Sequence, residues 1–195
     1  MHVMAFAMSP RRGGNTDIML EACVRGMERA GADVEIHRTH DMDIEPCISC
    51  GGCEKSFGCR FDDDFTALVD RIVSCDGMVF SSPLYFMNVP ARGKAFVDRC
   101  QMFWAARYRL NHAMFGDRPR FGLLLSCAGA GRGPGGSDVF RGISDTMTYV
   151  YDALGLEGQD SVFGRRIDVS GEIAAHDDLL AEADKAGFDS VMKYL

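Results

Sequence analysis

The first thirty residues hold the pattern that most restricts the fold, a strand followed by a glycine-rich loop and a helix. An apolar run from His2 to Met8 predicts a buried strand, and the polar stretch Ser9-Pro10-Arg11-Arg12-Gly13-Gly14-Asn15-Thr16 follows it directly. From Ile18 to Ala30, apolar residues recur every three or four positions, which predicts an amphipathic helix. A strand joined to a helix by a short loop is the repeating unit of parallel α/β sheets.

The loop between this strand and helix has the features of an anion-binding site. A helix N-terminus offers unpaired N–H groups and a positive dipole end, and the hydroxyls of Ser9 and Thr16 lie in the same stretch. Arg11 or Arg12 adds positive charge, and Gly13-Gly14 gives the backbone freedom for close approach. The spacing fits neither the dinucleotide fingerprint nor the nucleoside-triphosphate loop. At this point an ordinary strand-to-helix turn remains the alternative.

The remainder of the chain continues to alternate between strand and helix patterns. Strand patterns occur at 33–37, 77–82, 121–126 and 160–169, and helical patterns follow Asp62, span about 91–107, follow Ser137 and span 173–195. This alternation predicts a three-layer, doubly wound, parallel five-stranded sheet of order 2-1-3-4-5 in a single domain, residues 1–195. Ligands of such sheets bind in the loops after strands one, three and four. Those loops are 9–16, 83–90 and the glycine-rich segment 127–136.

Composition restricts the partners. The chain has 195 residues, of which 47% are hydrophobic, so one domain can bury a core of ordinary size. Acidic residues outnumber basic ones by 28 to 21, for a net charge of -7, which argues against nucleic acid and anionic membranes as partners. Met1 is followed directly by a strand pattern, and no apolar run approaches the roughly 18 residues that span a bilayer. We therefore expect a soluble cytoplasmic protein that binds neither nucleic acid nor membrane.

Four of the eight cysteines lie within an irregular insertion at about 40–61. Cys47, Cys50, Cys53 and Cys59 follow the spacing C-x2-C-x2-C-x5-C, and Gly51-Gly52 allows the backbone to turn so that the thiols face one volume. This spacing is closer to compact ferredoxin runs than to zinc ribbons, which places a [4Fe-4S] cluster first among the metals. Zinc and free or redox-active thiols remain alternatives. Three other cysteines sit on helical patterns and are predicted to be small core residues: Cys23, Cys75 and Cys100.

Three motifs together resemble a known family. The first loop resembles G-S-P-R-x-x-G-N-T, with Met8 where a glycine is usual, and it matches at Ser9, Pro10, Arg11, Gly14, Asn15 and Thr16. A second motif, P-x-Y, matches Pro83 and Tyr85, and a third, K-x-F-x-D-R, matches Lys94, Phe96, Asp98 and Arg99. Over roughly its first 135 residues the chain resembles the flavodoxin-fold NAD(P)H-dependent FMN reductases and, among them, the iron-sulfur flavoproteins.

The resemblance implies an FMN site built from the three loops. Phosphate-holding positions would be Ser9, Arg11, Gly14, Asn15 and Thr16. The flavin ring would be flanked by Pro83, Leu84, Tyr85, Phe86 and Asn88 on one side and by Ser126, Gly129 and Gly131 on the other. Independently of the resemblance, an aromatic and proline loop opposite a glycine-rich loop offers the planar apolar slot that a flavin needs. No catalytic side chain is expected, because the cofactor carries the chemistry.

Two functions from different classes follow. The first is an FMN-dependent oxidoreductase that passes electrons from NAD(P)H to a quinone, flavin, metal or other acceptor. The alternative is an iron-sulfur flavoprotein electron carrier that is reduced by a ferredoxin-like partner and uses no nicotinamide. A homodimer or homotetramer is also expected, because the chain after the third helix places more large apolar residues than one sheet face can cover: Met102, Phe103, Trp104, Tyr108, Met114 and Phe115.

Overall fold

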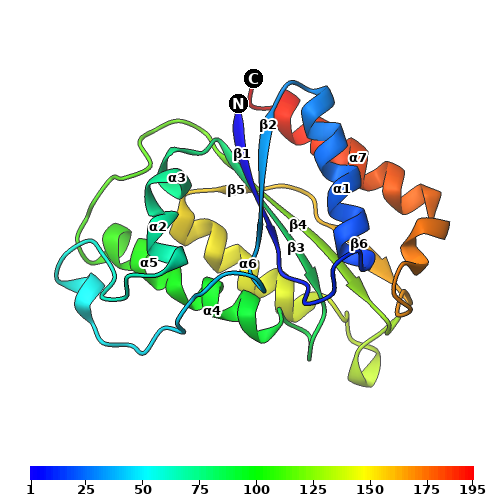
Figure 1. The fold of residues 1–195 in the computed structure, drawn as a ribbon, viewed down its shortest axis with the longest axis horizontal. Coiled ribbons are helices and arrows are strands. Elements are labelled where there is room, and N and C mark those ends of the chain that lie inside the picture. The colour runs from blue at the N-terminus through cyan, green and yellow to red at the C-terminus, as the bar shows by residue number, and fades with distance from the viewer.

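The computed structural model describes residues 1–195 and shows a parallel sheet between two layers of helices (Figure 1). The strands stand in the order β2-β1-β3-β4-β5, and a further short strand, β6, pairs with β4. Their bounds are β1 His2–Ala7, β2 Asp33–Arg38, β3 Gly77–Pro83, β4 Phe121–Ala128, β5 Glu157–Gly158 and β6 Val162–Arg165. The predicted doubly wound sheet of order 2-1-3-4-5 is confirmed.

The helices cover both faces of the sheet. In Figure 1, α1 and α7 lie on one side and the remaining helices lie on the other. The bounds are α1 Asn15–Arg29, α2 Asp64–Ala67, α3 Val69–Ser74, α4 Ala91–Arg99, α5 Gln101–Tyr108, α6 Arg141–Leu154 and α7 Asp177–Met192. Since β3 and β4 are covered on both faces, their side chains are almost all buried, which explains the continuous apolar runs in the sequence. No helix is long and apolar enough to cross a membrane.

The fifth strand differs from the expected span of 160–169. It is divided into β5, which pairs with Phe121 and Gly122, and β6, which pairs with residues from Leu125 to Ala128. The polar residues 159–161 separate the two pieces. An edge strand has ladder bonds on one side only, so a break there costs less than a break in the middle of the sheet.

The four later helices also have limits that differ from the prediction. The helix expected after Asp62 is divided at Leu68 into α2 and α3, and the helix expected over 173–195 spans Asp177–Met192. The helix expected to follow Ser137 begins at Arg141, because the Ser137 hydroxyl donates to the Pro134 carbonyl (2.9 Å) and Asp138 accepts the Phe140 N–H (3.2 Å). The helix expected over 91–107 is divided at Cys100 into α4 and α5. Cys23, Cys75 and Cys100 are buried in the core, as predicted.

Helices α1 and α7 touch through their backbones. A Cβ at Gly26 of α1 would collide with the Asp184 carbonyl, and a Cβ at Gly187 of α7 would collide with the Cys23 carbonyl. Arg29 and Asp184 form a bidentate pair across the same contact, at 2.8 and 2.7 Å. The last helix therefore covers the first one so closely that no side chain fits between them at these two glycines.

Candidate functional site

The main pocket lies at the carboxyl edge of the sheet, where the loops after β1, β3 and β4 meet. Nine of the residues predicted from the sequence line it: Ser9, Arg11, Gly14, Asn15, Thr16, Pro83, Leu84, Tyr85 and Gly129. Phe86, Asn88, Ser126 and Gly131 do not line it. The fold thus brings the three unusual loops to one place, as parallel strand order requires.

The α1 end of this pocket is an open helix N-terminus. The cap residue, Gly14, supplies no side-chain cap, and the N–H groups of Asn15 and Thr16 have no acceptor in the protein. Thr16 is buried, and its hydroxyl makes no hydrogen bond to protein. Arg12 pairs with Asp41 at 2.5 Å and does not line the pocket, whereas Arg11 lines it without an ion-pair partner. Arg11 is therefore the cation that this end of the pocket offers to an anion.

The loop before α1 is held in shape by its own side chains. The Ser9 hydroxyl accepts the Arg11 N–H (3.1 Å) and donates to the Arg11 carbonyl (3.2 Å). The Gly13 N–H donates to the buried Asp17 carboxylate (2.9 Å), which also pairs with Arg38 at 2.7 Å. Ser9 and Asp17 therefore fix the loop, which leaves the α1 N–H groups and the Thr16 hydroxyl free for a ligand.

A tight turn forms the second wall. Tyr85 and Asn88 exchange backbone hydrogen bonds (2.8 and 3.0 Å), and the residues between them, Phe86 and Met87, have φ of 49° and 64°. Such left-handed angles are costly for large side chains and occur where structure is needed for function. The Asn88 side chain accepts the Val89 N–H and donates to Thr146, so Asn88 holds the turn rather than facing the pocket. Phe86 is fully exposed beyond the pocket rim.

The loop after β4 forms the third wall, but two residues predicted to line it, Ser126 and Gly131, do not. Ser126 is completely buried, and its hydroxyl donates to the Ser82 carbonyl (2.7 Å) inside the sheet. Its neighbour Cys127 lines the pocket instead. Burial raises the pKa of Cys127 to about 12, so this thiol is neutral at pH 7. Gly131 lies outside the pocket, beside Arg166.

A fourth wall, after β6, was missed from the sequence. Ile167, Asp168 and Ser170 line the pocket there. The Asn15 side chain ties this segment to α1, because its amide donates to the Val169 carbonyl (2.9 Å) and its oxygen accepts the Ile173 N–H (3.2 Å). The strand order could have predicted this wall, since the carboxyl end of any parallel strand next to β4 lies at the same edge of the sheet as the pocket.

The four clustered cysteines line a second pocket, together with Phe61, Arg99 and Met102. Cys47 and Cys50 are exposed, Cys53 and Cys59 are partly buried, and none is in a disulfide. Burial, followed by the nearby thiolates, raises the pKa of Cys53. No group of three or more metal-binding side chains is arranged as a metal site in the structure. The donor set suits a metal, but its present geometry is open.

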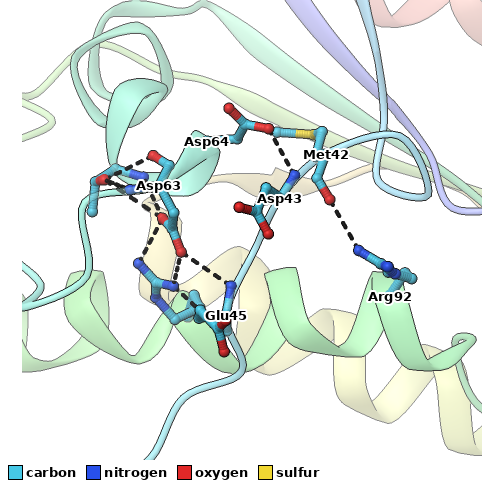
Figure 2. Close-up of polar contacts among 8 residues, drawn as sticks. Met42, Asp43, Glu45, Asp63, Asp64 and Arg92 are labelled. Atoms are coloured by element: carbon cyan, nitrogen blue, oxygen red, sulfur yellow. Dashed lines mark hydrogen bonds and ion pairs between the residues drawn. The ribbon is translucent and has the colours of Figure 1, made fainter.

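The stem of the cysteine loop is held by α2 and α4 (Figure 2). Asp64 accepts the Asp43 N–H (2.7 Å), and Asp63 accepts the Glu45 N–H (3.1 Å). The buried Arg99 donates to both Asp63 oxygens (2.6 and 3.0 Å) and to the Glu45 carbonyl (2.8 Å). Its guanidinium also lies over the Phe61 and Phe65 rings. The last residue of the K-x-F-x-D-R motif is therefore the anchor of this stem.

The apolar set after the third helix is largely explained by the chain's own core. Met102 and Phe103 are buried, and Met114 and Phe115 pack against the same core. Tyr108 is half exposed. The premise that one sheet face cannot cover this set is wrong, because the loop before β4 folds back over α5 and adds to the core.

Comparison with known proteins places this geometry in a family. The family model of the NADPH-dependent FMN reductases matches residues 1–138 of this chain. An iron-sulfur flavoprotein of Methanosarcina thermophila is 26% identical over 164 residues, which are 84% of this chain and 81% of that protein. An iron-sulfur flavoprotein of Archaeoglobus fulgidus is 33% identical over 99 residues, or 51% of this chain, and the match spans only 45% of that relative.

A solved structure supports the same fold. An NAD(P)H:quinone oxidoreductase from Methanothermobacter marburgensis superimposes with a TM-score of 0.73, covering 97% of this chain and 95% of the other, at 22% identity. At this identity the likeness concerns the fold alone. The family match, by contrast, covers more than half of the chain and includes the first three walls of the pocket. The chain therefore belongs to the NADPH-dependent FMN reductase family and is an FMN-dependent oxidoreductase.

Proposed function

We propose that this protein binds FMN in the pocket at the carboxyl edge and passes electrons from NAD(P)H to a quinone, flavin, metal or other acceptor. The observation that carries this proposal is the uncapped N-terminus of α1, which opens on the same pocket as the Pro83–Tyr85 segment. A phosphate suits the unpaired N–H groups of Asn15 and Thr16, and Arg11 supplies the opposite charge.

The other walls suit an aromatic ring. Pro83, Leu84 and Ala128 offer apolar surface, and the neutral thiol of Cys127 adds no charge. Tyr85 is 45% exposed at the rim, where a second planar group can approach. Bound FMN supplies hydride and single-electron chemistry, so the residues of the pocket need only bind the cofactor, orient it and exclude water.

The test is rapid mixing of the FMN-loaded protein with NADPH or NADH without oxygen, followed by flavin absorbance. Fast bleaching with either nucleotide supports the reductase. A flavin that stays oxidised with both nucleotides, yet is reduced by a reduced ferredoxin, supports the electron-carrier alternative. The observation that favours the electron-carrier function is the pocket lined by the four clustered cysteines.

A [4Fe-4S] cluster on Cys47, Cys50, Cys53 and Cys59 is part of the proposal. Support comes from the shared pocket of the four thiols and from relatives named iron-sulfur flavoproteins. Iron and acid-labile sulfide are measured on protein purified without oxygen, with Cys50→Ser as the variant and the buried Cys100→Ala as its control. Less than about one iron per chain in the unmutated protein leaves zinc or free thiols as the use of this loop.

We further propose a homodimer or homotetramer in a reducing cytoplasm. Tyr149 is 77% exposed on α6, beside an open groove with Trp104 and Val97 that a second copy can cover. All eight cysteines are free, which suits a reducing compartment. Light scattering at micromolar concentration that gives the chain mass of 21.4 kDa contradicts the oligomer.

A further inference from the structure

The segment after β6 forms a rigid wall of the main pocket, although it lies beyond the residues that match the family description. The Ile167 N–H donates to the Ala128 carbonyl (3.0 Å), which joins the segment to β4. The Glu172 carboxylate accepts the N–H groups of Asp168 and Val169 (2.8 and 3.0 Å). Together with the two Asn15 bonds described above, these contacts fix the backbone of the wall before any ligand arrives.

Asp168 stands out on this wall because its carboxylate has no partner. It lines the pocket but makes no ion pair and accepts no hydrogen bond from protein, whereas nearby Asp138 pairs with Arg165 (2.8 Å) and Asp17 pairs with Arg38. The carboxylate also lies directly against Gly129. A Cβ at position 129 would stand 2.9 Å from the Asp168 Cγ and Oδ1 atoms. A side chain at position 129 would displace the carboxylate from this place.

We propose that Asp168 accepts a hydrogen bond from bound FMN and that its negative charge lowers the reduction potential of the flavin. The proposal rests on the proposed FMN site. An ionised carboxylate only accepts hydrogen bonds, so its partner on the nucleotide is a donor, either a ribityl hydroxyl or the ring N3–H. The phosphate is excluded by like charge, and it is assigned instead to Arg11 and the α1 N-terminus.

The position of Asp168 agrees with this role. The residue lies between Gly129, on the wall predicted to meet the ring, and the segment that Asn15 ties to the phosphate end. Asp168 is exposed at the pocket wall. Reduction adds negative charge to the flavin, and a negative charge held beside the ring opposes that addition. The same carboxylate therefore strengthens binding of oxidised FMN through its hydrogen bond and disfavours the reduced cofactor through its charge.

The variants are Asp168→Ala, which removes the acceptor, and Asp168→Asn, which removes only the charge. Asp160→Asn is the matched control, because it makes the same change of charge before the opposite end of β6, outside the main pocket. FMN affinity is measured by fluorescence titration, and the midpoint potential by titration against a dye. We expect Asp168→Ala to weaken binding of oxidised FMN about tenfold or more. We expect Asp168→Asn to raise the midpoint potential, by about 30 mV for each tenfold gain in relative affinity for the reduced form.

Two FMN analogues identify the donor. If the partner is N3–H, the effect of Asp168→Ala disappears with 3-methyl-FMN and persists with lumiflavin, which lacks the ribityl chain. If the partner is a ribityl hydroxyl, the reverse holds. An effect that persists with both analogues overturns the hydrogen bond.

The outcomes separate this inference from the proposed function. If the unmutated protein binds no FMN, the proposed function fails first. If it binds FMN and both Asp168 variants match Asp160→Asn in affinity and in potential, the proposed function stands and the role of Asp168 is overturned.

Discussion

The two pockets of this protein differ in what holds their walls. Those of the main pocket are the ends of β1, β3, β4 and β6, which the hydrogen-bonded sheet fixes relative to one another. The cysteine pocket is enclosed by irregular chain, and the N–H groups of residues 46–51 donate to no acceptor in the protein. Its order depends on the stem, where Arg99 and Asp63 hold Glu45.

This difference separates a site that exists before its ligand from one that its ligand completes. A flavin nucleotide entering the main pocket meets an open helix N-terminus that is already in place. Four thiols on an otherwise unbonded loop have to be gathered by whatever they bind, so binding and local folding become one event there. The predictions below test whether the contrast is real.

The largest expected effect is at the stem. Arg99→Met leaves the Asp63 carboxylate buried without its cation and the Glu45 carbonyl without a donor, which is expected to lower the free energy of unfolding by about 3–5 kcal/mol. Urea unfolding measures this change.

The control is Lys94→Met on the same helix. Lys94 and Asp98 are both more than 40% exposed, so their loss is expected to cost only about 0.3–0.5 kcal/mol. Equal effects of the two variants contradict the anchoring role of Arg99.

FMN is expected to stabilise one pocket only. At a free concentration a hundredfold above its Kd, a ligand that binds only the folded state adds about 2.7 kcal/mol to the free energy of unfolding. Hydrogen exchange then slows at the loop before α1 and at residues 167–170, while residues 46–51 keep exchanging fast. Protection of the cysteine loop by FMN alone contradicts the separation of the two regions.

The phosphate end is tested by Thr16→Val, which keeps the shape of the side chain and removes its free hydroxyl. We expect FMN affinity to fall by about 1.5–3 kcal/mol, the usual worth of a hydrogen bond to a charged group. Thr39→Val is the matched control, because Thr39 is also buried, its hydroxyl has no partner and it does not line the pocket. If FMN affinity is unchanged in Thr16→Val, the Thr16 hydroxyl does not bind the phosphate.

The smallest effect is the acid sensitivity of the stem. Burial opposes ionisation of Asp63, but the bonds from Arg99, Glu45 and Thr66 outweigh it and hold the pKa of this carboxyl below its usual range. A lowered pKa gives stability that is present above the unfolded value, about 3.9, and is lost as pH falls through the folded value. As pH falls below 5, the free energy of unfolding should therefore decrease less steeply in Arg99→Met than in the unmutated protein. Identical slopes of this free energy against pH contradict a role of the Arg99–Asp63 ion pair in acid sensitivity.

The sequence was a good guide to the sheet and a partial guide to the pocket. Continuous apolar strands, helical spacing and the glycine loops are local signals, and they predicted the order of the strands and three of the four walls. Side-chain direction is not local. Ser126 points into the sheet and Cys127 lines the pocket, because neighbouring residues of a strand face opposite ways.

The sequence also did not predict contacts between residues that lie far apart along the chain. Asn15 was predicted to face the phosphate, and its N–H is free to do so, but its side chain is engaged more than 150 positions away along the chain. Nothing near Asn15 in the sequence indicates that contact. Likewise, the pairing of Arg12 with Asp41, which leaves Arg11 for the pocket, depends on where the chain runs after β2.

The backbone contact between α1 and α7 has a consequence for how the protein is made. The helix that opens the phosphate end leaves the ribosome early, but the surface that covers it, around Gly187, is synthesised much later. The wall with Asp168 and the segment that binds the Asn15 side chain also follow β6, far along the chain from α1. A nascent chain therefore carries three of the four walls before the fourth wall and the cover of α1 have been synthesised, and the complete pocket forms only after α7 has left the ribosome.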